Sequence, residues 1–164
     1  MSTSNYGIII IWPKAFELEY QSYIECEIQK CFKVVYKNVV EFSDFEEFLS
    51  FCMYIYIRES WIISSGFNAL EHKAKMCFSN DNKIAYYVVE YCDVHDLMDI
   101  KEQIRSKCDV GKHSVHTTDN IEQFRYVSMI INLFELKKAR LLKHRTEWGG
   151  VLKEIKEREI ILFE

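Results

Sequence analysis

The chain has 164 residues, 49% of them hydrophobic and 28% charged, which fits one domain with a substantial core. Its formal net charge of −4 argues against broad, nonspecific nucleic-acid binding, which needs an excess of Lys and Arg. The N-terminus carries no basic export signal, and its apolar run is too short to span a membrane, so we expect a cytoplasmic location. Six cysteines form no C-x-x-C pair, which predicts reduced thiols and no zinc site.

The first half of the chain predicts two strands and two helices. A continuous apolar run over residues 7–12, ended by Pro13, is typical of a buried strand. Helical spacing of apolar residues follows over 20–32, and the β-branched stretch 34–42 predicts a second strand. A capping box at Ser43 and Glu46 then begins a helix with Phe48, Cys52 and Tyr56 on its inner face.

The second half repeats this alternation. Residues 61–76 are interpreted as a helix, and 84–90 as a third strand after a turn at 79–82. Asp93 is placed to cap the next helix, and residues 113–117 suit a short final strand. A second capping box, Asp119 with Glu122, begins another helix. The predicted order is therefore β-α-β-α-β-α-β-α.

The C-terminal part, residues 135–164, differs in character from residues 1–134. It alternates positive and negative charges up to Glu159 and ends in the apolar run Ile160–Phe163. We interpret it as a charged extension whose apolar end packs on the domain or on a neighbouring subunit, because such a run would promote association if exposed.

The segment most suggestive of chemistry is Gly111-Lys112-His113-Ser114-Val115-His116-Thr117-Thr118-Asp119. Glycine permits close approach of the backbone, Lys112 supplies charge, and the following helix offers free N–H groups, all of which suit phosphate. A neutral imidazole there is a competent nucleophile toward a phosphoryl group. On a strand, His113 and His116 point to opposite faces, which argues against a shared metal ion.

The stretch Val110–Glu122 resembles the active-site signature of nucleoside diphosphate kinases, roughly V-G-[RK]-N-x-x-H-[GA]-S-D-S-x-E. The resemblance extends over about residues 6–134. It implies a ferredoxin-like α+β sandwich, with a four-stranded antiparallel sheet covered by helices. It also implies a phosphotransferase that carries phosphate on His116 as a phosphohistidine, uses ATP or another nucleoside triphosphate with Mg²⁺, and forms symmetric oligomers.

The same resemblance assigns further roles. Lys14, Arg105, Lys112, His113 and Thr118 would contact phosphate, Val110 would line the base pocket, and Asp119 would support the site. The chain departs from the signature where Trp12 replaces a lysine, His113 an asparagine, Thr117 a glycine and Val127 a supporting glutamate. The stretch before the motif is also shortened.

Three hypotheses follow. The first is a nucleotide-dependent phosphotransferase acting through His116. The second is a catalytically degenerate module that binds a nucleotide or a protein, and the altered clamp residues favour it. The third is a hydrolase that uses His113 and His116 together. A pocket filled by Trp12 or Thr117 would favour the second hypothesis, whereas both histidines converging with Lys14 or Arg105 would favour catalysis.

Overall fold

The computed structural model describes residues 5–143. They form four strands: β1 (Asn5–Ile11), β2 (Lys33–Glu41), β3 (Lys83–Tyr91) and β4 (Val115–Thr117). The strand order is β2-β3-β1-β4, and every neighbouring pair is antiparallel. This is the four-stranded antiparallel sheet of a ferredoxin-like α+β fold, as expected from the sequence.

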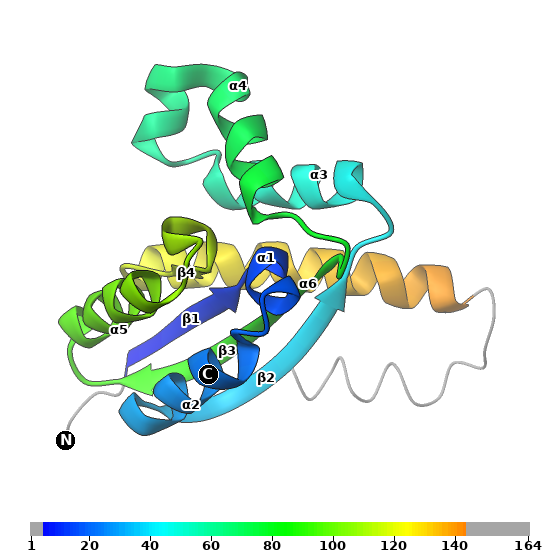
Figure 1. The fold of residues 1–164 in the computed structure, drawn as a ribbon. Coiled ribbons are helices and arrows are strands. Elements are labelled where there is room, and N and C mark those ends of the chain that lie inside the picture. Colours follow the sequence, from blue (N-terminus) through cyan, green and yellow to red (C-terminus); the bar gives the residue numbers. More distant parts are fainter. Residues whose placement is uncertain (1–4, 144–164) are drawn as a thin grey trace.

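Six α-helices accompany the sheet in the described residues (Figure 1). They are α1 (Pro13–Glu17), α2 (Gln21–Cys31), α3 (Phe45–Tyr56), α4 (Ser60–Cys77), α5 (Val94–Lys107) and α6 (Ile121–Lys143). The order agrees with the predicted elements, including two helices in the second connection, except that the first connection holds a short additional helix, α1. Helix α4 is kinked at Gly66, whose φ of 71° lies in the left-handed region that glycine tolerates.

Two hydrophobic cores lie on opposite sides of the sheet because successive side chains of a strand point to opposite faces. Ile8, Ile10 and Trp12 enter the core under α3, α4 and α6. Ile9 and Ile11 enter the core under α2 and α5. Figure 1 shows α2 and α5 on one face of the sheet and α6 across the other.

Three local predictions need correction. Helix α3 is capped by Asp44, not Ser43: Asp44 Oδ1 accepts from Glu47 N at 2.8 Å, while Ser43 bonds the Glu47 carboxylate. Helix α6 is likewise capped one residue later than predicted, at Asn120, which accepts from Gln123 N at 2.8 Å. In each case two adjacent residues can cap the helix, and the prediction named the first of them, whereas the second is the cap. His113 lies in a 3₁₀ turn, Gly111–His113, and the last strand begins only at Val115.

Helix α6 crosses residue 134, so residues 135–139 of the predicted extension continue it with described side chains. Glu135 accepts hydrogen bonds from Tyr86 Oη at 2.9 Å and Asn38 Nδ2 at 2.5 Å. These bonds hold that turn of α6 against β2 and β3. The rest of the predicted extension, residues 144–164, lies outside the described residues. Within residues 5–143, no helix is long and apolar enough to cross a membrane.

The cap of α5 offers a test of how its helix is anchored. Asp93 Oδ1 accepts from His95 N at 2.9 Å, as predicted. Replacement by alanine leaves that N–H without its side-chain partner, and we expect Asp93→Ala to lower the free energy of unfolding by about 1 kcal/mol. Asp93→Asn keeps the acceptor and serves as the control in urea denaturation. Equal losses in both variants would show that the cap contributes nothing.

Candidate functional site

His116 lies at the centre of β4, opposite Ile10 of β1. Its side chain is only 8% exposed, and its ring packs against Trp12 and Tyr56, with centroids 6.2 and 5.3 Å apart. Burial, followed by the charges of Lys101, Lys73 and Arg105, lowers the pKa of His116 to about 3, while Asp119 acts in the opposite direction. The imidazole is therefore neutral at physiological pH.

The Nε2 atom of His116 is buried and has no hydrogen-bond partner among the described residues. Val127, which the resemblance places where a glutamate would support the imidazole, is fully buried in the apolar core. Valine cannot accept a hydrogen bond, so it cannot replace that glutamate. A buried polar atom without a partner is costly, and such atoms are rare outside functional or unusual sites.

Trp12 directly follows β1, at the position of the lysine in the resemblance. Its side chain is 0% exposed and packs on Phe48, Phe51 and Tyr56 in addition to His116. Its backbone N donates to Ser114 O at 2.9 Å, which fixes the strand end beside β4. The place where a cation would face phosphate is thus filled by an aromatic ring that belongs to the core.

A cation that the sequence analysis missed lies beside His113. Lys73 of α4 donates from Nζ to Lys112 O at 2.6 Å, and the same atom lies 3.5 Å from His113 Nδ1. Burial lowers the pKa of Lys73, and the charges of Arg105 and Lys112 act in the same direction. Among the described residues, no carboxylate lies within ion-pair distance of Lys73.

His113 shares this cationic environment. Burial, followed by the charges of Lys73 and Lys112, lowers the pKa of His113 to about 4. Its Nδ1 also lies 3.7 Å from the Sγ of Cys77, whose own pKa burial raises to about 11, so this thiol stays protonated. We call Lys73, Arg105, Lys112 and His113 the cationic cluster.

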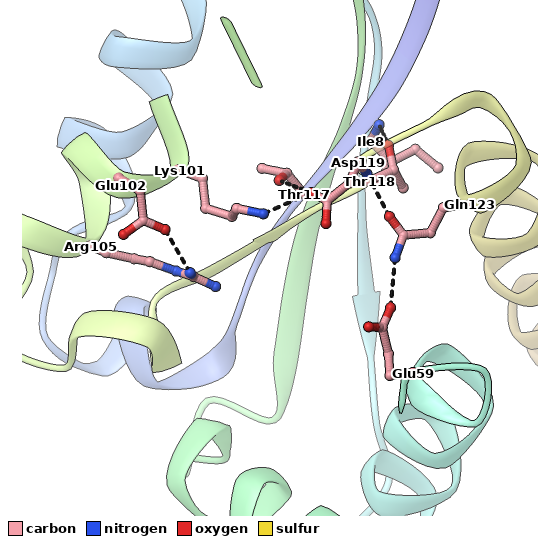
Figure 2. Close-up of polar contacts among 9 residues, drawn as sticks. All are labelled: Ile8, Glu59, Lys101, Glu102, Arg105, Thr117, Thr118, Asp119 and Gln123. Atoms are coloured by element: carbon pink, nitrogen blue, oxygen red, sulfur yellow. Dashed lines mark hydrogen bonds and ion pairs between the residues drawn. The ribbon is translucent and has the colours of Figure 1, made fainter. Parts of the chain in front are cut away.

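Arg105, in the last turn of α5, completes the cluster. Its Nη1 donates to Glu102 at 2.9 Å, whereas its Nε is buried without a partner among the described residues (Figure 2). Its positive charge lowers the pKa values of both His113 and His116. The guanidinium on α5 therefore favours the neutral form of both histidines, which lie in the 3₁₀ turn and in β4.

Two other predicted phosphate ligands are engaged elsewhere. Lys14 forms an ion pair with Glu17 at 2.5 Å on the surface of α1. The hydroxyl oxygen of Thr118 accepts a hydrogen bond from Ile8 N at 2.9 Å and so extends the pairing of β1 with the β4 end (Figure 2). Val110, the predicted base-pocket residue, packs against the core under α2 and α5.

Asp119 belongs to a chain of polar contacts that links three helices (Figure 2). It accepts from Lys101 of α5 at 2.7 Å, and its backbone N donates to Gln123 Oε1. Gln123 then donates to Glu59, at the start of α4, at 2.7 Å. These polar contacts connect the beginnings of α4 and α6 to α5, next to the strand that carries His116.

The structure thus gathers Arg105, Lys112 and His113 of the sequence-predicted set, and adds Lys73. No local signal marked Lys73, since it lies in a helix where alternating Lys and Glu are usual on a solvated face. Tyr56 was expected on the inner face of its helix, but its contact with His116 could not be read from spacing alone.

The buried imidazole predicts how stability depends on pH. In the unfolded chain His116 takes a proton below about pH 6.5, whereas in the folded chain it does so only near pH 3. Protons then favour unfolding, so this contribution to stability falls by roughly 2 kcal/mol between pH 7 and pH 5. Between pH 7 and pH 5, the free energy of unfolding measured by urea denaturation should therefore fall less in His116→Phe than in the wild type, by about that amount. Identical pH slopes would mean that the native imidazole is accessible to protons.

No protein-family model matches this chain, and no curated protein sequence matches it. Solved structures do. The nucleoside diphosphate kinase of Aquifex aeolicus superposes with a TM-score of 0.55 at 18% identity, over 79% of this chain and 95% of that one. The nucleoside diphosphate kinase of Borrelia burgdorferi, with bound vanadate and ADP, superposes with a TM-score of 0.55 at 10% identity, over 77% of this chain and 86% of that one. The nucleoside diphosphate kinase of Encephalitozoon cuniculi superposes with a TM-score of 0.53 at 14% identity, over 76% of this chain and 86% of that one. This chain therefore has the fold of nucleoside diphosphate kinases.

Proposed function

We propose that the protein binds the phosphate groups of a nucleotide at the cationic cluster of Lys73, Arg105, Lys112 and His113. The single observation that carries this proposal is the environment of Lys73. Its ammonium group is partly withdrawn from water, faces other cations and has no carboxylate partner among the described residues. Such an arrangement is unfavourable alone and becomes favourable when an anion binds.

The chemistry of the cluster suits phosphate in particular. Ammonium and guanidinium groups donate charge-assisted hydrogen bonds to phosphate oxygens, and arginine can do so with two parallel bonds. Arg105 has a buried Nε and places its positive charge on the same cluster as Lys73. The fold shared with nucleoside diphosphate kinases supports a nucleotide as the source of that phosphate.

The surroundings of His116 weigh against transfer of the phosphate. A reacting phosphorus must come within about 3–3.5 Å of the attacking nitrogen, in line with the bond that breaks. Trp12 and Tyr56 pack on the imidazole, and the ring is nearly inaccessible to solvent. A lysine is also absent from position 12, and one missing donor of this kind costs on the order of 10²–10³ in rate.

A second candidate function is phosphotransfer through His116. The observation that favours it is a neutral imidazole whose Nε2 has no partner among the described residues. In that mechanism a ring nitrogen attacks the terminal phosphorus, the bond to the bridging oxygen breaks, and the nucleoside diphosphate leaves. A second diphosphate then accepts the phosphate. Cations of the cluster would offset the charge that develops on the phosphate.

Mg²⁺ has a limited place in either mechanism. Within the described residues, no group of three or more His, Cys, Asp or Glu side chains could hold a metal ion. Three members of the cluster, Lys73, Arg105 and Lys112, are cations, which suit phosphate oxygens and not Mg²⁺. The ion therefore enters the proposal only as a companion of the nucleotide's own phosphates. A cytoplasmic location and self-association complete the proposal.

Nucleotide binding by Lys73→Gln tests the proposal. Loss of a charged donor to phosphate should weaken the binding of ATP or ADP about tenfold or more, and the wild-type affinity should fall with added salt. Lys75→Gln is the matched control, because Lys75 lies on the same helix, is exposed and pairs with Glu71 at 2.6 Å. Calorimetric titration measures both. Equal affinities in the two variants, or no binding by the wild type, would contradict the proposal.

Incubation with ATP labelled in its γ-phosphate, with Mg²⁺, separates the two candidate functions. Because Trp12 and Tyr56 cover the imidazole, we expect no acid-labile label on the wild type, although nucleotide binds. Label on the wild type that is absent from His116→Ala would establish a phosphohistidine and support the second candidate. His95→Ala, at an exposed histidine on α5, controls for nonspecific labelling.

A further inference from the structure

A groove of about 610 Å³ runs between α3 and α6, and His116 is not among the residues that line it. Its wall and floor residues come from both helices: Glu47, Ser50, Tyr54, Tyr126, Met129, Ile130, Leu133, Phe134 and Lys137. Tyr126 Oη donates to Tyr54 O at 2.7 Å and joins the two sides at one point. The groove belongs to a different part of the fold from the cationic cluster, so its use is independent of the proposed function.

The groove is mostly apolar and open. Ile130 and Phe134 are buried in the core below it, while Tyr54, Met129 and Leu133 are 45%, 48% and 54% exposed. A contiguous set of large apolar side chains on a surface usually marks a place where another segment packs. At one end, Lys137 pairs with Glu47 at 3.4 Å, so the groove also has a polar edge.

The chain itself contains a segment of matching character. Ile160, Ile161, Leu162 and Phe163 are consecutive and apolar, and they follow a stretch, residues 144–159, that holds four positive and four negative side chains. The stretch before them is hydrophilic, with no net charge to repel it from the Glu47–Lys137 edge. The apolar run supplies the large aliphatic and aromatic side chains that an apolar groove accepts.

The connection is long enough. Leu133 and Lys143 are ten residues apart on α6, which corresponds to about 15 Å along a helix. The sixteen residues 144–159 would span roughly 20–24 Å root-mean-square as a flexible chain. A tethered segment with such reach has an effective concentration of about a millimolar, so it outcompetes the same segment of a second molecule at ordinary protein concentrations.

We propose that Ile160–Phe163 packs into the α3–α6 groove of its own chain and covers Tyr54, Met129 and Leu133. The apolar end of the sequence is then an internal part of the domain. The charged stretch before it spans the surface between the end of α6 and the groove.

Methionine oxidation in the full-length protein tests this packing. Met129 in the groove and Met98 on α5 have similar exposures, 48% and 44%, in residues 5–143. If Ile160–Phe163 covers the groove, dilute peroxide should oxidise Met129 about tenfold more slowly than Met98. Leu162→Asp places a charge in the apolar run and should bring the two rates together. Mass spectrometry of peptides gives both rates from one sample.

Further variants and conditions make the outcome decisive. Ile160→Asp should repeat the effect of Leu162→Asp, whereas Leu152→Asp, which adds the same charge outside the apolar run, should leave Met129 protected. Protection should not change with protein concentration. Equal oxidation of Met129 and Met98 in the wild type would overturn the proposal. So would protection that grows with concentration alongside a dimer in sedimentation, because the occupant would then belong to a second copy.

Discussion

The structure depends on β1, a strand that is apolar on both faces and hydrogen-bonded on both edges. It pairs with β3 on one side and β4 on the other, and its side chains enter both cores. Because a central strand has no solvent-facing side, a polar residue in it would lose hydration without an evident partner. The run Ile8–Ile11 meets this constraint, and Trp12 extends it by one residue toward the site.

This extension changes the chemistry of the site. An indole at position 12 contributes to the aromatic core with Phe48 and Phe51, and the same ring packs on His116. The core gains packing where the nucleoside diphosphate kinase signature has a cation. Positive charge is instead brought in by Lys73 on α4, through the kinked α3–α4 pair that Figure 1 shows above the sheet. The positive charge nearest to the two histidines thus comes from a helix and not from the end of β1.

Polar contacts around β4 hold this arrangement in place. Thr118 extends the pairing to β1, and Asp119 joins Lys101 to Gln123 and, through it, to Glu59 (Figure 2). Together these contacts connect β1, α5, α6 and the start of α4 to the end of the short strand that carries His116. A three-residue strand has few backbone hydrogen bonds of its own, so these side-chain contacts make a large share of what positions it.

The sequence alone determined the order of the elements apart from the short helix α1, the two-faced burial of the first strand and the place of His116 before a capped helix. These features depend on local periodicity and on capping chemistry, which act between residues close in the chain. The caps were predicted one residue early because Ser43 and Asp44, and Asp119 and Asn120, are adjacent residues that can all cap a helix.

The composition of the site was decided by the tertiary structure. Lys73 meets His113 across 40 positions, and Trp12 meets His116 across more than a hundred, and neither pair leaves a periodic trace in the sequence. Tertiary packing also leaves Nε2 of His116 without a hydrogen-bond partner among the described residues. It likewise places Lys14 beside Glu17 and Thr118 beside the backbone of Ile8. Local patterns fix which face of an element is apolar, but desolvation and charge at a site are sums over all the elements that surround it.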